Sequence, residues 1–221
     1  MRILVIAPHP DDEVLGCGGA IARHVAEGHE VHVVVAGRGT PELFSDETIA
    51  TSRRELDAAH RVLGISSVTY FDFPAPCFDT VPQHHLADRT ADVFRKLKPA
   101  IVYLPHHGDL HSDHRQMHLA TLVAARPLAG CSIRRLLAYE TLSETEWAPP
   151  TPDATFIPTV FVDIEEYLPK KLEAMSCYQS KLVPPPHPRS LQAIETLARW
   201  RGGTVHLSAA EAFSQIREII V

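Results

Sequence analysis

Short apolar runs alternate with amphipathic segments along the chain up to Tyr139. The run RILVIA is apolar at nearly every position, which is typical of a strand buried on both faces of a parallel sheet. The segment TSRRELDAAHRVL has helical spacing and is followed by Gly64, a residue that often ends helices. The pattern predicts strands at Arg2–Ala7, Glu30–Ala36, Val68–Phe73, Ala100–Leu104 and Arg135–Tyr139, and helices at Gly19–Glu27, Thr51–Leu63, His84–Lys98 and Asp113–Ala125.

This order of elements predicts an α/β fold: a Rossmann-like, mostly parallel sheet flanked by helices in a single domain. We expect residues 1–221 to form one domain, with a C-terminal subregion from about Pro158. The proline-rich pieces at Ala148–Pro152 and Pro184–Pro188 are interpreted as ordered loops, because apolar periodic segments follow each of them. In such sheets, ligands bind at the carboxyl ends of the strands.

Composition narrows the class of protein. The formal charge is -6 and no basic run is longer than a dipeptide, which argues against nucleic-acid binding. No apolar stretch approaches the roughly 20 residues that a membrane span requires, and the N-terminus enters a strand without the regions of a signal peptide. The four cysteines are far apart and form no CxxC motif, so we expect reduced thiols in a cytoplasmic protein.

The first predicted strand leads into APHPDDEVLGCGG, where three consecutive acids precede a run of glycines. Such acids repel one another and are costly to desolvate, so a metal cation, solvent exposure or a phosphate-type ligand site has to offset the cost. His9 and Asp12 are three residues apart, and one turn can aim both at a single ion. The alternative is that Asp11 or Asp12 simply caps the following helix.

A second polar cluster, HHGDLHSDHRQMH, follows the predicted strand AIVYL. His111 and His114 are three residues apart at a helix start and can share one face, whereas His106, His107 and His118 are interpreted as loop or helix surface. Two clusters of histidine and aspartate at strand ends, in a chain with 14 histidines and only 8 phenylalanines, predict a metal site. Histidine with carboxylate suits Zn²⁺, which at a catalytic site needs three protein ligands and an open position for water.

These two motifs also carry a resemblance. APHPDDE together with DLHSDHR resembles the signature pair of the PIG-L/LmbE deacetylases, zinc-dependent enzymes that remove acetyl groups from N-acetylglucosamine-type sugars. Further segments occur in the order typical of a bacterial branch of the family, so the resemblance covers essentially the whole chain: ELDAAHRVLGI, YFDFP, YETLSETEW, FVDI, KLEAMSCYQSKL, PHPRS and AEAF. The resemblance implies Zn²⁺, or alternatively Fe²⁺, bound by His9, Asp12 and His114.

It also implies roles for three further residues: Asp11 as general base, His111 as the oxyanion-stabilising or proton-donating group, and Asp113 behind His111. Zinc lowers the pKa of its bound water to about 7, and a carboxylate beside the metal can take that water's proton. A protonated His111, oriented by Asp113, would stabilise the oxyanion. The sequence leaves open whether Asp11 or His111 protonates the leaving amine. Glu13 is expected to hydrogen-bond to the loop or to stabilise the helix N-terminus, and the glycines at 16, 18 and 19 are expected to permit a tight turn and close contact of helix and sheet.

Substrate contacts are predicted at Arg53, His187 and Arg189. Ser52 stands where family members most often have an arginine, so the role passes to Arg53. His187 and Arg189 lie in PHPRS and are expected to reach the site, either within the chain or across a subunit contact. The expected partner is a small N-acetylated sugar or conjugate. Family members often form trimers or hexamers, and nothing in the chain decides its oligomeric state.

Three alternative functions are compatible with parts of the sequence. One keeps the zinc site but hydrolyses a different small-molecule amide conjugate. A dinucleotide-binding oxidoreductase is less favoured, because GCGG lacks the third glycine of G-x-G-x-x-G and no acid clearly ends the second strand. A non-catalytic sugar- or metal-binding protein would lack a nucleophile activator, yet Asp11 is present.

Overall fold

A computed structural model describes residues 1–220. Its strands are β1 (Arg2–Ala7), β2 (Glu30–Gly39), β3 (Ser67–Ala75), β4 (Ile101–Pro105), β5 (Arg135–Tyr139), β6 (Val160–Asp163) and β7 (Ala210–Glu218). Its helices are α1 (Asp12–Ala26), α2 (Asp46–Leu63), α3 (Gln83–Leu97), α4 (Ser112–Ala124), α5 (Leu168–Ser176) and α6 (Leu191–Gly203), with a 3₁₀ turn at Phe78–Thr80. The strands form one sheet in the order β3-β2-β1-β4-β5-β7-β6.

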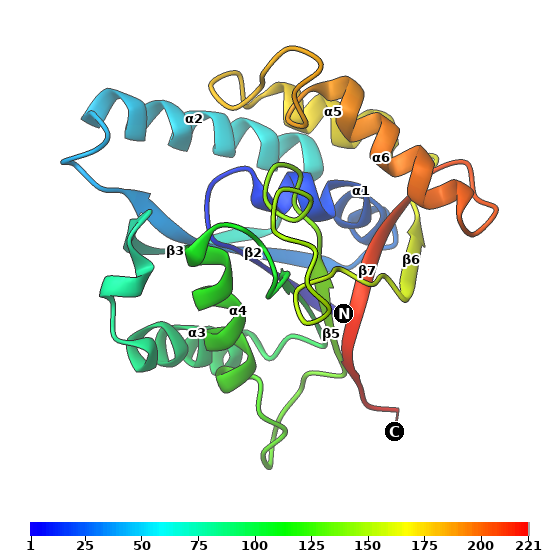
Figure 1. Ribbon diagram of the computed structural model, residues 1–221. Helices are drawn as coiled ribbons and strands as arrows, with labels where there is room; N and C mark the ends of the chain where they lie inside the picture. Colours follow the sequence, from blue (N-terminus) through cyan, green and yellow to red (C-terminus); the bar gives the residue numbers. More distant parts are fainter. Residues whose placement is uncertain (221) are drawn as a thin grey trace.

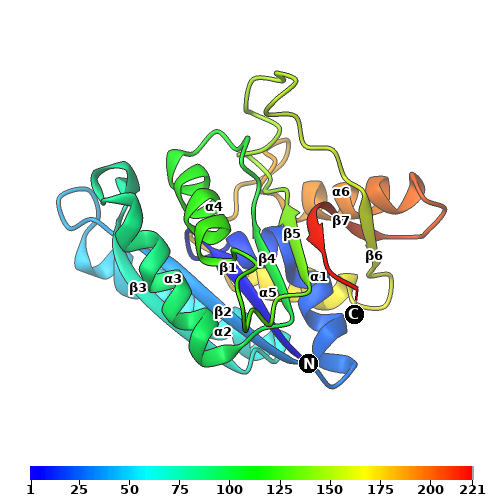
Figure 2. The ribbon, with the colours of Figure 1, turned by 90° about the horizontal axis from the view of Figure 1, so that it is seen from below.

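The sheet is covered on both faces (Figures 1 and 2). Helices α1, α2, α5 and α6 lie on one face, and α3 and α4 lie on the other. Strand β1 contributes to both cores: Ile3 and Val5 pack with the first group of helices, whereas Leu4 and Ile6 pack with the second. This two-sided burial explains why the strand is apolar at consecutive positions.

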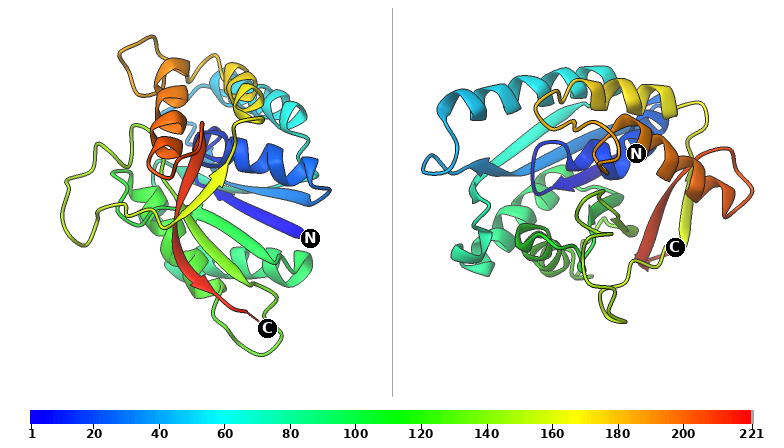
Figure 3. Two further views of the ribbon diagram at one scale, coloured as in Figure 1. Left: turned by 90° about the vertical axis from the view of Figure 1, so that its right-hand side faces the viewer. Right: turned by 45° about the horizontal axis from the view of Figure 1, so that its top comes forward.

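The first five strands are parallel, and the last two are antiparallel to their neighbours. Strand β7 lies between β5 and β6, so the segment from Pro158 onward extends the same sheet, as Figure 3 shows for the neighbouring β6 and β7. The predicted fold class, a single α/β domain with a mostly parallel sheet, is confirmed. Within residues 1–220, no helix has both the length and the apolar character needed to cross a membrane.

Helix α1 begins at Asp12, seven residues before the predicted start, because its glycines are packing positions inside the helix. A Cβ on Gly16 would overlap the ring of Tyr139, a fully buried side chain whose hydroxyl donates to the carbonyl of Ile6 at 2.7 Å. The predicted close contact of helix and sheet is therefore confirmed, but there is no turn within GCGG. Helix α2 also begins early, at Asp46, where Ser45 caps it by accepting from the Thr48 amide.

Strand β1 lies between β2 and β4, so successive connections leave it in opposite directions. The loops after β1 and β4 therefore meet at the carboxyl edge of the sheet, which is the usual ligand position in open α/β folds. Both polar clusters of the sequence lie at this edge.

Candidate metal centre and catalytic site

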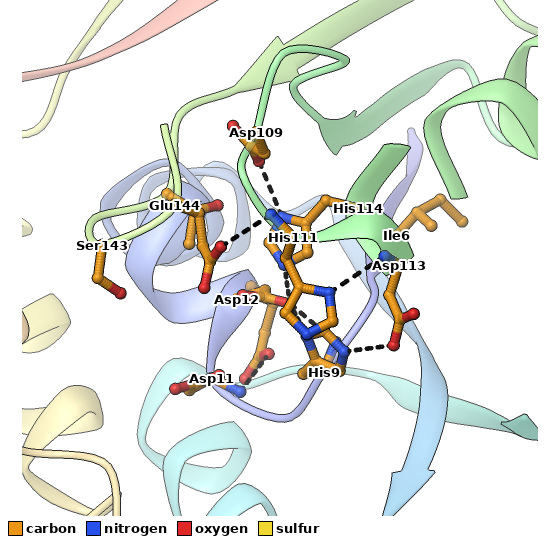
Figure 4. A network of polar contacts seen from close by, with 12 residues as sticks. Ile6, His9, Asp11, Asp12, Asp109, His111, Asp113, His114, Ser143 and Glu144 are labelled. Atoms are coloured by element: carbon orange, nitrogen blue, oxygen red, sulfur yellow. Dashed lines mark hydrogen bonds and ion pairs between the residues drawn. The ribbon is translucent and has the colours of Figure 1, made fainter. Parts of the chain in front are cut away.

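Three side chains from two distant loops converge at this edge (Figure 4). His9 follows β1, Asp12 opens α1, and His114 lies in the first turn of α4. One nitrogen or oxygen atom of each lies within 4.8 Å of the others. Asp12 Oδ2 is 3.4 Å from Nδ1 of His9 and 3.3 Å from Nε2 of His114. The structure thus brings together all three residues predicted as metal ligands.

The chemistry of this group fits a divalent cation. Asp12 Oδ1 and His114 Nε2 are buried without a hydrogen-bond partner among the described residues, a costly state for polar atoms. Burial alone would raise the pKa of Asp12, but His114 and His9 outweigh it and hold that pKa well below its usual range. An ionised carboxylate between two imidazoles is a donor set that Zn²⁺ accepts.

The outer nitrogens of both histidines are bound to buried carboxylates. Nδ1 of His114 lies 2.8 Å from Oδ2 of Asp109, whose Oδ1 accepts from the Thr145 hydroxyl at 2.6 Å. Nε2 of His9 lies 2.9 Å from Oδ2 of Asp113. Such partners orient ligand imidazoles and raise their basicity, and here they leave His9 Nδ1 and His114 Nε2 facing Asp12.

The position of Asp113 corrects the expectation that it lies behind His111. Its carboxylate contacts His9 and accepts from the Phe78 amide at 3.0 Å instead. Only its backbone amide reaches His111, donating to Nδ1 at 3.1 Å. The reason is local: His111 is the N-cap of α4, so its ring turns back over the first helical turn while the Asp113 side chain points toward the loop after β1.

His111 is held as a neutral donor. Because Nδ1 accepts from the Asp113 amide, the ring proton is on Nε2. Burial, followed by the charge of His9, lowers the pKa of His111 to about 4, so the expected protonated form does not fit this environment. The His111 amide donates to Glu144 Oε2 at 3.2 Å, which fixes the loop at this point.

Asp11 has a backbone conformation that aspartate rarely adopts. Its φ is 115°, and such residues persist only where surrounding contacts hold them. The Asp11 amide donates to Oε2 of Glu13 at 3.2 Å, and Oε1 of Glu13 is bound by His60 at 3.0 Å and by the Tyr178 hydroxyl at 2.5 Å. The predicted role of Glu13 in holding the loop is confirmed.

The carboxylate of Asp11 is paired with a residue from the far end of the chain. Arg189, between α5 and α6, donates from Nη1 to Asp11 Oδ2 at 2.8 Å and from Nε to Ser143 Oγ at 2.7 Å. Its Nη2 lies 3.5 Å from Glu144 Oε1. Burial raises the pKa of Asp11 to about 7, although the charge of Arg189 opposes the shift.

A cavity of about 240 Å³ opens beside this group. His9, Asp11 and His111 line its inner part, and Arg53 and Arg189 also line it. The guanidinium of Arg53 lies 3.3 Å above the centre of the Tyr70 ring and 3.3 Å from Asp72 Oδ1. His187 does not line this cavity: its ring packs against Trp147, and its Nδ1 accepts from the Arg189 amide at 3.0 Å.

Comparison with known proteins gives the family. The model of the PIG-L family, described as GlcNAc-PI de-N-acetylase, matches residues 4–125, a range that contains both clusters. The chain belongs to the PIG-L family. The resemblance stated from the two motifs is confirmed, and the oxidoreductase alternative does not fit.

Relatives of this PIG-L chain agree with that assignment. The uncharacterized deacetylase YaiS of Escherichia coli K12 is 30% identical over 187 residues, which cover 80% of this chain and 90% of YaiS. A 1D-myo-inositol 2-acetamido-2-deoxy-alpha-D-glucopyranoside deacetylase of Kineococcus radiotolerans is 32% identical over 165 residues, 58% of this chain and 46% of that protein. The crystal structure of the conserved protein TT1542 from Thermus thermophilus matches 99% of this chain and 96% of its own, with a TM-score of 0.79 and 27% identity. Family and relatives together support a deacetylase.

Three residues of the PIG-L site were not predicted from sequence: Asp109, Glu144 and Lys181, which also lines the cavity. A carboxylate behind a ligand histidine is expected on chemical grounds, but spacing does not show which aspartate supplies it. Glu144 follows β5 at the carboxyl edge of the sheet, and this position was the available signal for it. Lys181 lies after α5, within the segment KLEAMSCYQSKL that resembles the family, but spacing alone does not assign this lysine to the site.

Proposed function

We propose that this protein is a zinc-dependent N-deacetylase that hydrolyses the acetamide of an N-acetylglucosamine-type sugar or conjugate. The observation that carries the proposal is the buried group of His9, Asp12 and His114, with two unpartnered ligand atoms, next to Asp11 and an open cavity. The family description and the Kineococcus relative's name support an acetamido sugar as the substrate class.

His9, Asp12 and His114 would hold the cation, with Fe²⁺ as the alternative to Zn²⁺. When bound, such an ion lowers the pKa of a coordinated water and polarises the substrate carbonyl. Asp109 and Asp113 hold the two imidazoles in the orientation that leaves one nitrogen of each facing Asp12.

Asp11 is proposed as the general base. It is next to Asp12 in the chain but has its own partner, Arg189, so its carboxylate is held at the cavity wall and away from the ligand group. A carboxylate in this position can accept a proton from the attacking water. Arg189 keeps the carboxylate oriented, and His187 in turn accepts from the Arg189 amide.

His111 is proposed to donate its Nε2 proton in a hydrogen bond to the acetyl oxygen as negative charge develops there. A neutral imidazole that gave up this proton entirely would become an anion, so His111 is unsuited to protonate the leaving amine. We therefore assign that step to Asp11, which holds the proton received from water. Of the two proton donors that the sequence left open, this proposal favours Asp11.

The substrate is proposed to extend from the metal group along the cavity to Arg53, which can bind a hydroxyl or an anionic group. The trimer or hexamer that the family suggests stays a prediction, for which light scattering is the measurement. An amide conjugate other than an acetamido sugar is the alternative substrate, and a panel of both classes separates the two.

The test combines metal analysis with acetate release. The protein, purified without added metal, should contain about one zinc or iron at this site, and chelation should abolish acetate release. Asp11→Asn should keep the metal and lose about 10²–10⁴-fold in turnover, because a general base typically contributes that factor. Asp88→Asn, at an exposed position on α3, is the matched control and should behave as wild type. Normal turnover of Asp11→Asn would refute the assigned base, and an active metal-free protein would refute the function.

A further inference from the structure

A second group of ligand-type side chains lies at the opposite end of α1 from the proposed active site. Near the C-terminus of the helix, one ligand atom each of His24, Glu27 and His29 lies within 4.8 Å of the others. Twelve residues separate His24 from Asp12, which corresponds to about 18 Å along the helix axis. This group is therefore separate from the one that holds the proposed catalytic metal.

The helix end itself fixes this arrangement. The Gly28 amide donates to the carbonyl of Val25 at 3.0 Å, and the His29 amide donates to the carbonyl of His24 at 2.9 Å. These two bonds, with Gly28 at a φ of 78°, form a Schellman motif, in which the residues at positions 24 and 29 come side by side. An apolar contact is common at these two positions, but here two imidazoles occupy them with ring centres 5.9 Å apart.

Each of the two rings and the carboxylate has one polar atom in contact outside the group and another within 3.8 Å of a group member; the outer atom of His29 is Nδ1, 3.2 Å from the N-terminal amine of Met1. His24 Nε2 lies 2.9 Å from the hydroxyl of the buried Tyr103, and Glu27 Oε1 accepts from Arg23 at 2.8 Å. His24 Nδ1 is buried and has no hydrogen-bond partner among residues 1–220.

The spacing is too wide for direct hydrogen bonds and suits an intervening ion. Glu27 Oε2 lies 3.7 Å from His24 Nδ1 and 3.8 Å from His29 Nε2. Ligands at 2.0–2.2 Å from a tetrahedral zinc ion are about 3.4 Å apart, so a small contraction brings all three atoms into range. The C-terminal end of a helix also favours positive charge.

We propose that His24, Glu27 and His29 form a second divalent-cation site, of zinc type, which ties the last turn of α1 to the chain entering β2. Two imidazoles and a carboxylate are a ligand set that zinc accepts, with water in the remaining position. Tyr103 acts as the outer partner that orients His24. The role of this site is structural, because it lies at the amino edge of the sheet, away from the cavity.

The test is a zinc titration by calorimetry of untagged, chelator-treated protein. Wild type should bind two equivalents and His29→Gln one, with deacetylase activity retained. The control His85→Gln, an exposed position on α3, should still bind two. If the proposed catalytic site failed instead, wild type would bind one equivalent and His29→Gln none. A His29→Gln protein that binds as many equivalents as wild type would overturn the second site.

A second measurement does not depend on the catalytic metal. In an Asp12→Asn background, micromolar Zn²⁺ should raise the melting temperature, because an ion that binds only the folded state stabilises it. Adding Glu27→Gln should remove most of this rise in melting temperature. It should also weaken the remaining zinc affinity by at least about tenfold, because losing a ligand should cost no less than losing an outer partner. An undiminished shift in the double variant would overturn the proposal.

Discussion

Replacing Asp109 by asparagine tests how far the buried carboxylate behind His114 controls the proposed catalytic metal. Asp109 is fully buried and has two contacts, with His114 Nδ1 at 2.8 Å and with the Thr145 hydroxyl at 2.6 Å. Asparagine is nearly isosteric, and its side-chain oxygen can still accept from His114. The substitution therefore removes a negative charge while disturbing the packing very little.

The size of the effect follows from what that charge does. Burial lowers the pKa of His114, but Asp12 and Asp109 outweigh it and raise the pKa well above its ordinary value. Without the charge of Asp109, the imidazole is a weaker base and a weaker ligand. Loss of such an outer partner typically costs 10–100-fold in metal affinity, which corresponds to about 1.4–2.7 kcal/mol.

The assay is a competition titration of zinc against a chromophoric chelator, followed by acetate release at saturating zinc. Asp109→Asn should bind zinc 10–100-fold more weakly and recover most of its activity when zinc is in excess. Thr145→Val removes the second contact of Asp109, together with a hydrogen bond from the Thr141 amide, but keeps the contact with His114 and should have a smaller effect on zinc affinity; the exposed Asp88→Asn should have none. Zinc affinity within twofold of wild type would show that Asp109 does not support the metal ligand.

Two further predictions concern the cavity and the pH dependence of stability. Arg53→Met should raise KM about tenfold with little change in kcat, because hydrogen bonds to charged groups contribute about 1.5–3 kcal/mol. Arg54→Met is the control: the Arg54 side chain donates to Thr51 of the same helix, so KM should stay unchanged. Equal KM values for the two variants in steady-state kinetics would contradict this role of Arg53. Burial lowers the pKa of His118 to about 4 from an ordinary value of 6.5. As the pH falls, the unfolded chain therefore takes up a proton on this histidine before the folded protein does. The contribution of His118 to stability is full above pH 6.5 and is lost as the pH falls towards 4. His118→Gln retains a donor for the Pro105 carbonyl and should flatten this dependence in urea unfolding at pH 5 and 7.5; an unchanged difference would refute it.

The buried strands were the most predictable part of the fold. Strands β1 and β5 have the predicted bounds, because each is an apolar run that ends abruptly at polar residues or proline. The antiparallel strands β6 and β7 were not predicted as strands. Strand β7 is buried only over its first half, Ala210 to Phe213, which includes the charged Glu211, and its second half is exposed or half-buried. A partly exposed strand near the edge of a sheet gives a weaker apolar signal than a central one.

The start of α1 was missed for a different reason. Glycine has low helix propensity, so DDEVLGCGG has the composition of a turn. The helix forms because packing outweighs propensity: Gly16 lies against Tyr139, and Gly19 lies against Ile164, where side chains would not fit. Both partners are far away in the chain, so the local sequence does not contain the information that decides this helix.

The site, like the fold, has one part that the sequence predicted and one part that it did not. Two motifs at strand ends predicted a metal site, because parallel strands place their carboxyl ends at one edge, and the family resemblance added its ligands, His9, Asp12 and His114, which the structure brings together. The contacts around the three ligands were not predictable, because they depend on side-chain rotamers and on loops that come much later in the sequence. Asp113 turned toward His9 instead of His111, and Arg189 met Asp11 across 178 residues of sequence.

Burying three consecutive acids at the end of β1 costs desolvation and mutual repulsion, and each acid offsets this cost in a different way. Arg189 is the ion-pair partner of Asp11, whereas two hydrogen-bond donors, His60 and Tyr178, bind the carboxylate of Glu13. Only Asp12 keeps a buried oxygen without a partner, although buried carboxylates are otherwise paired throughout this edge of the sheet. A site that gives every neighbouring acid its partners and leaves this one oxygen free is arranged for a cation, because a buried polar atom without a hydrogen-bond partner otherwise costs about 1–3 kcal/mol of stability. Hence Asp12→Asn should abolish zinc binding at this site in a competition titration, and a variant that keeps wild-type zinc affinity there would contradict this account.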